Sequence, residues 1–258
     1  MLNANRQGGL SLVELMVGLT VGLIVIAGAT AIYVTNVRGQ TNALRAAKLN
    51  QELRATINLM VADIRRAGYW RGSITGAGTT AALPHPYSGT QTSLSVLTNG
   101  TCIMYAYDAD ADGVNGVEAG EVFAYRLNGN AVEMIDPGNA LAVTSDCSGT
   151  GWPALTSSTT VVIDALTFST TGSQCFDATK DLSWKLTAAG ATANPCSAAA
   201  ADVTMNAGAY VAPATGDIVS EVRQVTISIR GHHQNDSSVA STITETVHIP
   251  NDRLYVVP

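Results

Sequence analysis

Gly8-Gly9-Leu10-Ser11-Leu12-Val13-Glu14-Leu15-Met16 opens an apolar run that lasts to about Val34. One carboxylate, that of Glu14, lies inside this run. A carboxylate within a bilayer costs on the order of 2.5–3.5 kcal/mol on insertion scales, so it needs a partner and is expected to be functional. If the chain is cut between Gly9 and Leu10, Glu14 becomes the fifth residue of the mature protein. The new terminal ammonium group of one subunit could then neutralise Glu14 of its neighbour.

This layout resembles the prepilins, the class that contains type IV pilins and type II secretion pseudopilins. These proteins have a short basic leader ending in Gly, an apolar first mature residue, Glu at the fifth place and a long N-terminal helix. Here residues 1–9 form the leader, with Arg6 as its charge, and Leu10 stands where such families more often carry Phe. The resemblance implies that prepilin peptidase cuts between Gly9 and Leu10 and that the Leu10 amine is methylated. It also implies that Glu14 acts in assembly.

Two other interpretations of the apolar run are open. An ordinary secretory signal would use the small residues of Ala27-Gly28-Ala29-Thr30-Ala31 as its cleavage site. A plain anchor would use residues 10–34, which are long enough to span a bilayer of roughly 30 Å. The run is long for a secretory signal, and neither interpretation gives Glu14 a use.

The charge of the chain is distributed unevenly along its 258 residues. The formal net charge is −6, but residues 36–68 carry six basic and two acidic side chains, whereas the part from Tyr69 onward carries seven basic and seventeen acidic ones. Non-specific nucleic-acid binding depends on Lys and Arg that neutralise phosphates. An acidic C-terminal region therefore argues against nucleic acid as a partner.

The cysteines predict an oxidising compartment. Cys102, Cys147, Cys175 and Cys196 are widely spaced and contain no C-x-x-C pair, so disulfides are favoured over a zinc site. Four cysteines allow three pairings, and we prefer Cys102–Cys147 with Cys175–Cys196 because each bond closes one moderate loop. Disulfides of this kind indicate the periplasm or the cell surface.

The pattern along the chain predicts an α+β fold of the type IV pilin kind. One helix is expected from Leu10 to about Ala67, with residues 10–35 as the membrane and filament-core part and residues 36–68 as an amphipathic part. The amphipathic part should pack on a mainly antiparallel β-rich head, residues 69–258, through an apolar stripe with spacings of three and four residues. The stripe comprises Leu49, Leu53, Ile57, Met60, Ile64 and Ala67.

Short β-prone runs follow the helix, and the final two should form a hairpin with a turn at residues 232–238. The segment 170–214 is rich in Ala, Gly and Thr and is expected to be a disulfide-stapled surface loop that could hold short strands of its own. The predicted strands are residues 94–97, 102–107, 121–127, 131–135, 161–169, 222–230 and 241–249.

The head narrows the resemblance to minor pilins of the PilW type. The similar stretches are Asp63-Ile64-Arg65-Arg66-Ala67-Gly68-Tyr69, Cys102-Ile103-Met104-Tyr105-Ala106-Tyr107-Asp108, Phe123-Ala124-Tyr125-Arg126-Leu127 and Ile249-Pro250-Asn251-Asp252-Arg253-Leu254. This resemblance implies a low-abundance subunit that helps to initiate a type IV pilus and sits in a tip complex. It implies other minor and major pilins, a tip adhesin and prepilin peptidase as partners, and an association with twitching motility and cell adhesion. The precursor would lie in the inner membrane, facing the periplasm, and the mature protein in the extracellular pilus.

One acidic motif suggests a metal ion. Asp108-Ala-Asp110-Ala-Asp112-Gly113 resembles the start of a calcium-binding loop, with Gly at the sixth place. Place twelve is Ala119 instead of a bidentate Glu, although Glu118 and Glu121 are close by. Calcium is one interpretation, and a solvated hairpin tip is the other.

No motif of nucleophilic, metalloprotease or nucleotide chemistry is found, so the chain is not expected to be an enzyme. His232-His233 lacks an obvious third metal ligand. The alternatives to a PilW-type pilin are a minor pseudopilin of a type II secretion system and a membrane-anchored, calcium-dependent binding module.

Overall fold

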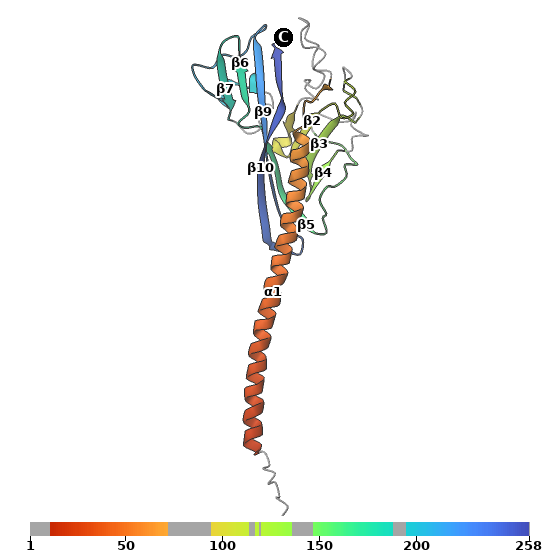
Figure 1. Cartoon of the computed structure of the whole chain (residues 1–258), viewed down its shortest axis with the longest axis vertical. Coiled ribbons are helices and arrows are strands. Elements are labelled where there is room, and N and C mark those ends of the chain that lie inside the picture. Colours follow the sequence, from red (N-terminus) through yellow and green to blue (C-terminus); the bar gives the residue numbers. More distant parts are fainter. Residues whose placement is uncertain are drawn as a thin grey trace, which may run out of the picture. The chain divides into compact units, whose positions relative to one another are not determined.

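A computed structural model describes residues 11–71, 94–113, 117–118, 120–135, 147–187 and 195–257 of the chain (Figure 1). The chain divides into two compact units, Met1–Ala47 and Lys48–Pro258. Helix α1, Leu12–Ile64, runs through the first unit and into the second. The expected helix was slightly longer at both ends, and Leu10 lies outside the described residues.

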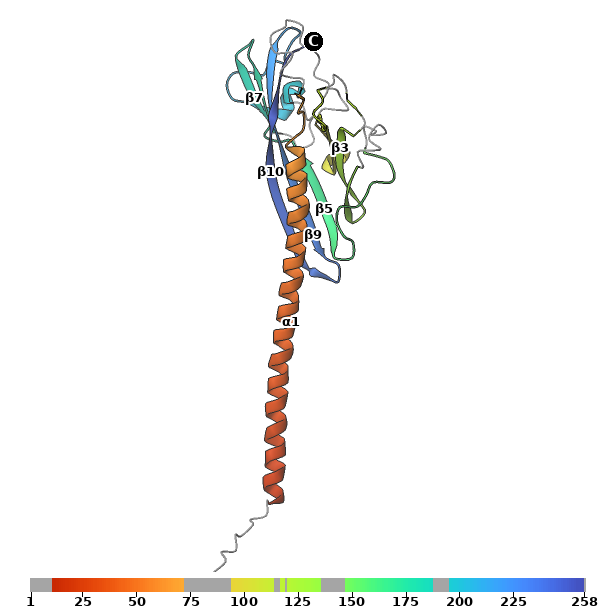
Figure 2. The same ribbon diagram turned by 45° about the vertical axis from the view of Figure 1, so that its right-hand side comes forward.

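The predicted apolar stripe forms the helical side of the core in the second unit. Each of its six residues is at most 1% exposed. The stripe packs against both sheets of the head, in one cluster with residues of β2 (Cys102–Ala106), β3 (Val122–Asn128), β5 (Val161–Ser169), β9 (Ile218–His233) and β10 (Asp236–Val256) (Figures 1 and 2). The helix is followed by turns up to Gly68, whose φ of 76° is the left-handed conformation typical of a helix C-cap. The Gly68 N–H donates to the Ala106 carbonyl of β2, so the helix end is tied to the first sheet.

The first sheet is antiparallel with the order β1-β2-β3-β4. Its strands are β1 (Ser95–Leu97), β2 (Cys102–Ala106), β3 (Val122–Asn128) and β4 (Ala131–Met134), and the short 3-10 helix η3 (Thr98–Gly100) joins β1 to β2. Both faces of β2 are buried. Ile103 and Tyr105 face the core that contains α1, while Met104 and Ala106 contact a second cluster that includes Trp70 and Ile135.

The second sheet is organised around β9. Its strands are β5 (Val161–Ser169), β6 (Gln174–Asp177), β7 (Leu182–Leu186), β8 (Val203–Met205), β9 (Ile218–His233) and β10 (Asp236–Val256). β10 pairs with one edge of β9, and the other edge is shared, since β6 pairs with residues 219–222 and β5 with residues 226–233. The alternation at residues 225–229 is confirmed: Val225, Ile227 and Ile229 are buried in the core.

The C-terminal hairpin is longer than its sequence pattern predicts. The predicted turn at residues 232–238 is wrong in extent, because His232 and His233 belong to β9 and Asp236 already pairs with His233. β10 also continues beyond Ile249, where the prediction stops. The pairing is irregular between Ile249 and Arg253, and Pro250, which lacks an N–H to donate to a ladder, lies in that interval.

The expected stapled loop contains three strands in its described part. β6, β7 and β8 form a small antiparallel extension of the second sheet, with the short 3-10 helices η5 (Pro195–Ser197) and η6 (Ala200–Asp202) before β8. A separate cluster of Cys175, Trp184, Cys196 and Val219 is buried here. Both predicted disulfides, Cys102–Cys147 and Cys175–Cys196, are confirmed.

Candidate functional site

Glu14 lies in the first turn of α1 and is exposed. The Leu15 N–H donates to the Ser11 carbonyl at 3.1 Å, which makes Ser11 the residue that precedes the helix and Glu14 its third residue. Ser followed three positions later by Glu is the capping-box pattern, and a negative charge in a first turn is stabilised by the helix dipole. Glu14 therefore has a local structural role available to it besides the role in assembly that its sequence pattern predicts. The predicted cleavage residues Gly9 and Leu10 lie outside the described residues.

The apolar half of α1 satisfies its hydroxyl groups internally. The side chains of Thr20, Thr30 and Thr35 donate to the carbonyls of Val17, Ile26 and Ala31 at 2.8–2.9 Å. Such back-bonding lets hydroxyls enter a bilayer without a partner from outside the helix. The helix is long and apolar enough to cross a membrane. Glu14 is the residue of this segment whose charge still needs compensation.

The five acidic residues of the predicted calcium motif lie in the loop between β2 and β3. Their carboxylates come together in two overlapping groups of three residues. One carboxylate oxygen from each of Asp108, Asp110 and Glu121 lies within 4.8 Å of the others, and the same holds for Asp110, Asp112 and Glu118. Asp108 and Glu121 are buried, whereas the members of the second group are exposed.

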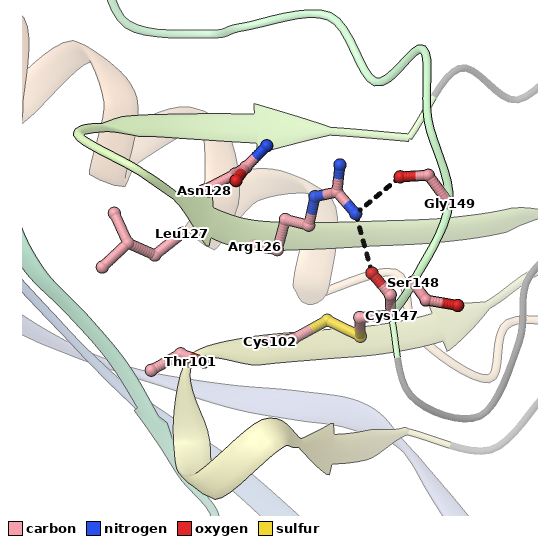
Figure 3. A pocket seen from close by; sticks show the side chains of 8 residues that line it. All are labelled: Thr101, Cys102, Arg126, Leu127, Asn128, Cys147, Ser148 and Gly149. Carbon is pink, nitrogen blue, oxygen red and sulfur yellow. Dashed lines mark hydrogen bonds between the residues drawn. A yellow bond between two sulfur atoms is a disulfide. The ribbon is translucent and has the colours of Figure 1, made fainter.

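A pocket of about 310 Å³ lies beside the Cys102–Cys147 disulfide (Figure 3). Arg126 lines this pocket, and its guanidinium group is fully engaged. Nε and Nη2 contact Glu133 at 2.8 and 2.7 Å. Nη1 donates to the carbonyls of Cys147 and Gly149 (Figure 3). The same group stacks on Trp152, 4.1 Å from the ring centre. Arg126 therefore fastens the segment around Cys147 to β3 instead of presenting a charge to a ligand.

Sequence reasoning missed the role of Asp63 at the end of α1. Its carboxylate accepts hydrogen bonds from the hydroxyls of Tyr105, Tyr125 and Tyr107 at 2.8, 3.1 and 3.1 Å. Arg66 donates to the Tyr107 hydroxyl at 2.8 Å. The alternation of Tyr105, on β2, and Tyr107, directly after it, places both side chains on one face of the extended chain, and this was the available signal. The group joins the helix to the first sheet.

The tyrosines of this cluster predict alkaline sensitivity. Burial raises the pKa of Tyr105 well above its ordinary value of 10, and burial likewise raises the pKa of Tyr125 and Tyr107, with the Asp63 charge adding to each shift. The unfolded chain then releases these protons near pH 10 while the folded chain keeps them. The free energy of unfolding should fall above pH 10, by up to about 4 kcal/mol per pH unit for three tyrosines.

Denaturant unfolding of the full chain in detergent at pH 8 to 11 measures this effect. The variant Tyr125→Phe should lose about a third of the alkaline slope. An unchanged slope in that variant would contradict the assignment.

The adjacent histidines point to different partners. His232 Nδ1 lies 2.8 Å from Asp164 Oδ1 on β5, whereas His233 Nδ1 accepts the Asn235 N–H in the hairpin turn. Neither belongs to the groups of possible metal ligands found among the described residues.

Comparison with known proteins agrees with the interpretation of the N-terminal pattern and also finds a family match that covers the head. Residues 42–249 match the family described as prepilin peptidase-dependent protein B, and residues 4–30 match the prokaryotic N-terminal methylation motif. The prepilin peptidase-dependent protein B of Escherichia coli (strain K12) is 22% identical over 162 residues, which cover 62% of this chain and 75% of that protein. No solved structure matches the chain.

Proposed function

Because the chain belongs to the family of prepilin peptidase-dependent protein B, we propose that it is a minor pilin of the PilW type. The chain is a prepilin with a membrane-anchoring helix. Its family consists of pilin-like structural proteins and not of enzymes. In the proposed role it helps to initiate a type IV pilus and takes a place in the tip complex. The methylation motif at residues 4–30 is the observation that carries this proposal, and the PilW-like stretches of the head support the subfamily.

The proposed mechanism starts in the inner membrane. Residues 10–35 hold the precursor there until prepilin peptidase removes residues 1–9. Glu14 then pairs with the terminal ammonium group of an adjacent pilin, which sets the axial register of the two helices. The exposed apolar side chains of α1 come together with those of neighbouring subunits, and their burial stabilises the filament core.

The partners in this mechanism are major and minor pilins, and a tip adhesin. The basic stretch at residues 36–68 is complementary to acidic heads such as the one in this chain. Complementary charge of this kind steers association more than it adds affinity.

The processing step predicts a specific N-terminus. Intact mass and N-terminal sequencing of the membrane-extracted protein should give a chain that begins at Leu10 in cells with prepilin peptidase and an uncut chain in cells without it. One added methyl group is expected on the processed chain. A terminus near Ile32, or an uncut chain in both strains, would contradict the proposal.

Deletion of the gene separates the pilus from a secretion system. A PilW-type pilin predicts loss of surface pili with type II secretion intact. Loss of secretion with normal pili would instead assign the chain to the minor pseudopilins.

A further inference from the structure

The two ends of the loop between β2 and β3 are held together where they leave the sheet. The loop also carries the acidic side chains whose carboxylates converge. The Tyr107 N–H donates to the Glu121 carbonyl at 3.1 Å, which places Asp108 and Glu121 side by side at the loop's entrance. Asp108 is also tied to the chain after α1, because its N–H donates to the Tyr69 carbonyl at 2.9 Å. The loop therefore has a rigid base on the first sheet.

The buried carboxylate of Asp108 is only half satisfied. Asp108 is 2% exposed, and its Oδ2 accepts the N–H groups of Arg71 and Gly113, each at 3.1 Å. Its Oδ1 is buried and makes no hydrogen bond with the described residues. A buried charged oxygen without a donor is costly, and a cation bound to this atom would offset that cost.

The surrounding charges favour a cation. The carboxylates of Asp110, Asp112, Glu118 and Glu121 converge with that of Asp108 in two overlapping groups, where like charges repel one another. Arg71 reaches the loop, but its Nη1 donates to the Ala111 carbonyl at 2.7 Å, so this contact neutralises no carboxylate.

The chemistry of the donors identifies the ion. All five side chains offer oxygen, which suits hard cations and disfavours zinc in comparison with Cys and His sites. Ca²⁺ accepts six to eight oxygens in flexible geometry, whereas Mg²⁺ demands a near-ideal octahedron. Gly113 has a φ of 77° and Ala111 one of 58°, so the loop turns sharply around the carboxylates.

We propose that this loop binds one calcium ion, with Asp108, Asp110 and Glu121 as the inner ligands and Asp112 and Glu118 completing the shell. The ion fixes the β2–β3 loop to the chain that follows α1, since Asp108 contacts both. Extracellular calcium modules bind with dissociation constants of about 10⁻⁴–10⁻³ M, and we expect this range. The proposal does not depend on the pilin role, because it concerns binding by the isolated chain.

Calorimetric titration and thermal unfolding of the full chain in detergent test the proposal. We expect one Ca²⁺ per chain and a Tm higher by roughly 3–6 °C when free Ca²⁺ is about ten times the dissociation constant. Mg²⁺ at the same concentration should give less than half of this shift. The variant Asp110→Asn removes a charge shared by both carboxylate groups but keeps an oxygen to accept the Asp112 N–H. It should weaken Ca²⁺ binding by tenfold or more.

The matched control is Asp181→Asn, which removes one charge at an exposed turn position with a φ of 53°, a conformation that Asn tolerates. It should bind Ca²⁺ as the parent chain does. Absence of binding in the parent chain, an equal response to Mg²⁺, or full binding by Asp110→Asn would each overturn the proposal.

Discussion

Replacing Glu14 with alanine is expected to reduce incorporation of the subunit into pili by tenfold or more while its head stays folded. The reason is the loss of the ion pair that we propose between Glu14 and the terminal ammonium group of the neighbouring subunit. Two unit charges 4 Å apart attract by about 4 kcal/mol at an effective dielectric constant of 20, and about 1.4 kcal/mol already corresponds to a factor of ten. The measurement is the ratio of subunit in sheared pili to subunit in membranes, by immunoblot. The head is checked by intact disulfides and tryptophan fluorescence.

A second variant separates the two roles open to Glu14. Glutamine preserves the capping-box pattern with Ser11 but carries no charge. Glu14→Gln should therefore fail in assembly almost as fully as Glu14→Ala, whereas Glu245→Gln, at an exposed position of β10, should assemble normally. Normal incorporation of Glu14→Gln would leave Glu14 with its helix-starting role alone and would overturn the charge-pairing mechanism.

Replacing Asp63 with alanine is expected to lower the free energy of unfolding of the head by roughly 3–5 kcal/mol. The change removes the acceptor of three tyrosine hydroxyls, and hydrogen bonds to charged groups contribute about 1.5–3 kcal/mol each, without adding fully. Tyr105 and Tyr125 are fully buried, so water cannot replace the carboxylate at low cost. Against a typical total stability of about 5–15 kcal/mol, the loss is large.

Guanidinium unfolding of the full chain in detergent measures this effect. All three tryptophans, Trp70, Trp152 and Trp184, lie in the second unit, so their fluorescence reports on the head. Asp63→Asn keeps one oxygen acceptor and should cost about half as much. Arg65→Ala, at an exposed position near the same helix end, should change stability by less than about 0.5 kcal/mol. An Asp63→Ala variant as stable as Arg65→Ala would contradict the structural role of the cluster.

Local periodicity was enough to predict the helix, its buried stripe and the seven strands with clear apolar patterns. Val225, Ile227 and Ile229 alternate with polar residues, and such alternation depends only on neighbours in the sequence. β6 to β8 were harder, because their segment is rich in Ala, Gly and Thr and shows little contrast between faces. The beginning of β9 was also hard to predict from the sequence. Glu221 and Arg223 are buried on the same face as Val225, and these charged residues interrupt the apolar pattern expected of a buried face.

The site was predictable only where its residues are close in sequence. The acidic motif lies within fourteen residues, and its carboxylates converge in two overlapping groups. The Asp63 cluster joins residues 42 to 62 positions apart, and nothing local in the sequence indicates that α1 ends over β2 and β3. Arg126 is similar, since its carbonyl partners belong to a segment held nearby by a disulfide.

The central place of β9 makes the folding of the head depend on its C-terminal hairpin. The stripe on α1 lies early in the chain, but β9 and β10, which cover it together with earlier strands, are the elements nearest the C-terminal end of this chain. Contacts that join such distant segments form slowly, because the intervening chain must first be ordered. The part of the apolar stripe that packs on β9 and β10 therefore stays uncovered until the last forty or so of these residues have folded onto it. Completion of this hairpin is the event that closes the core of the head around the stripe.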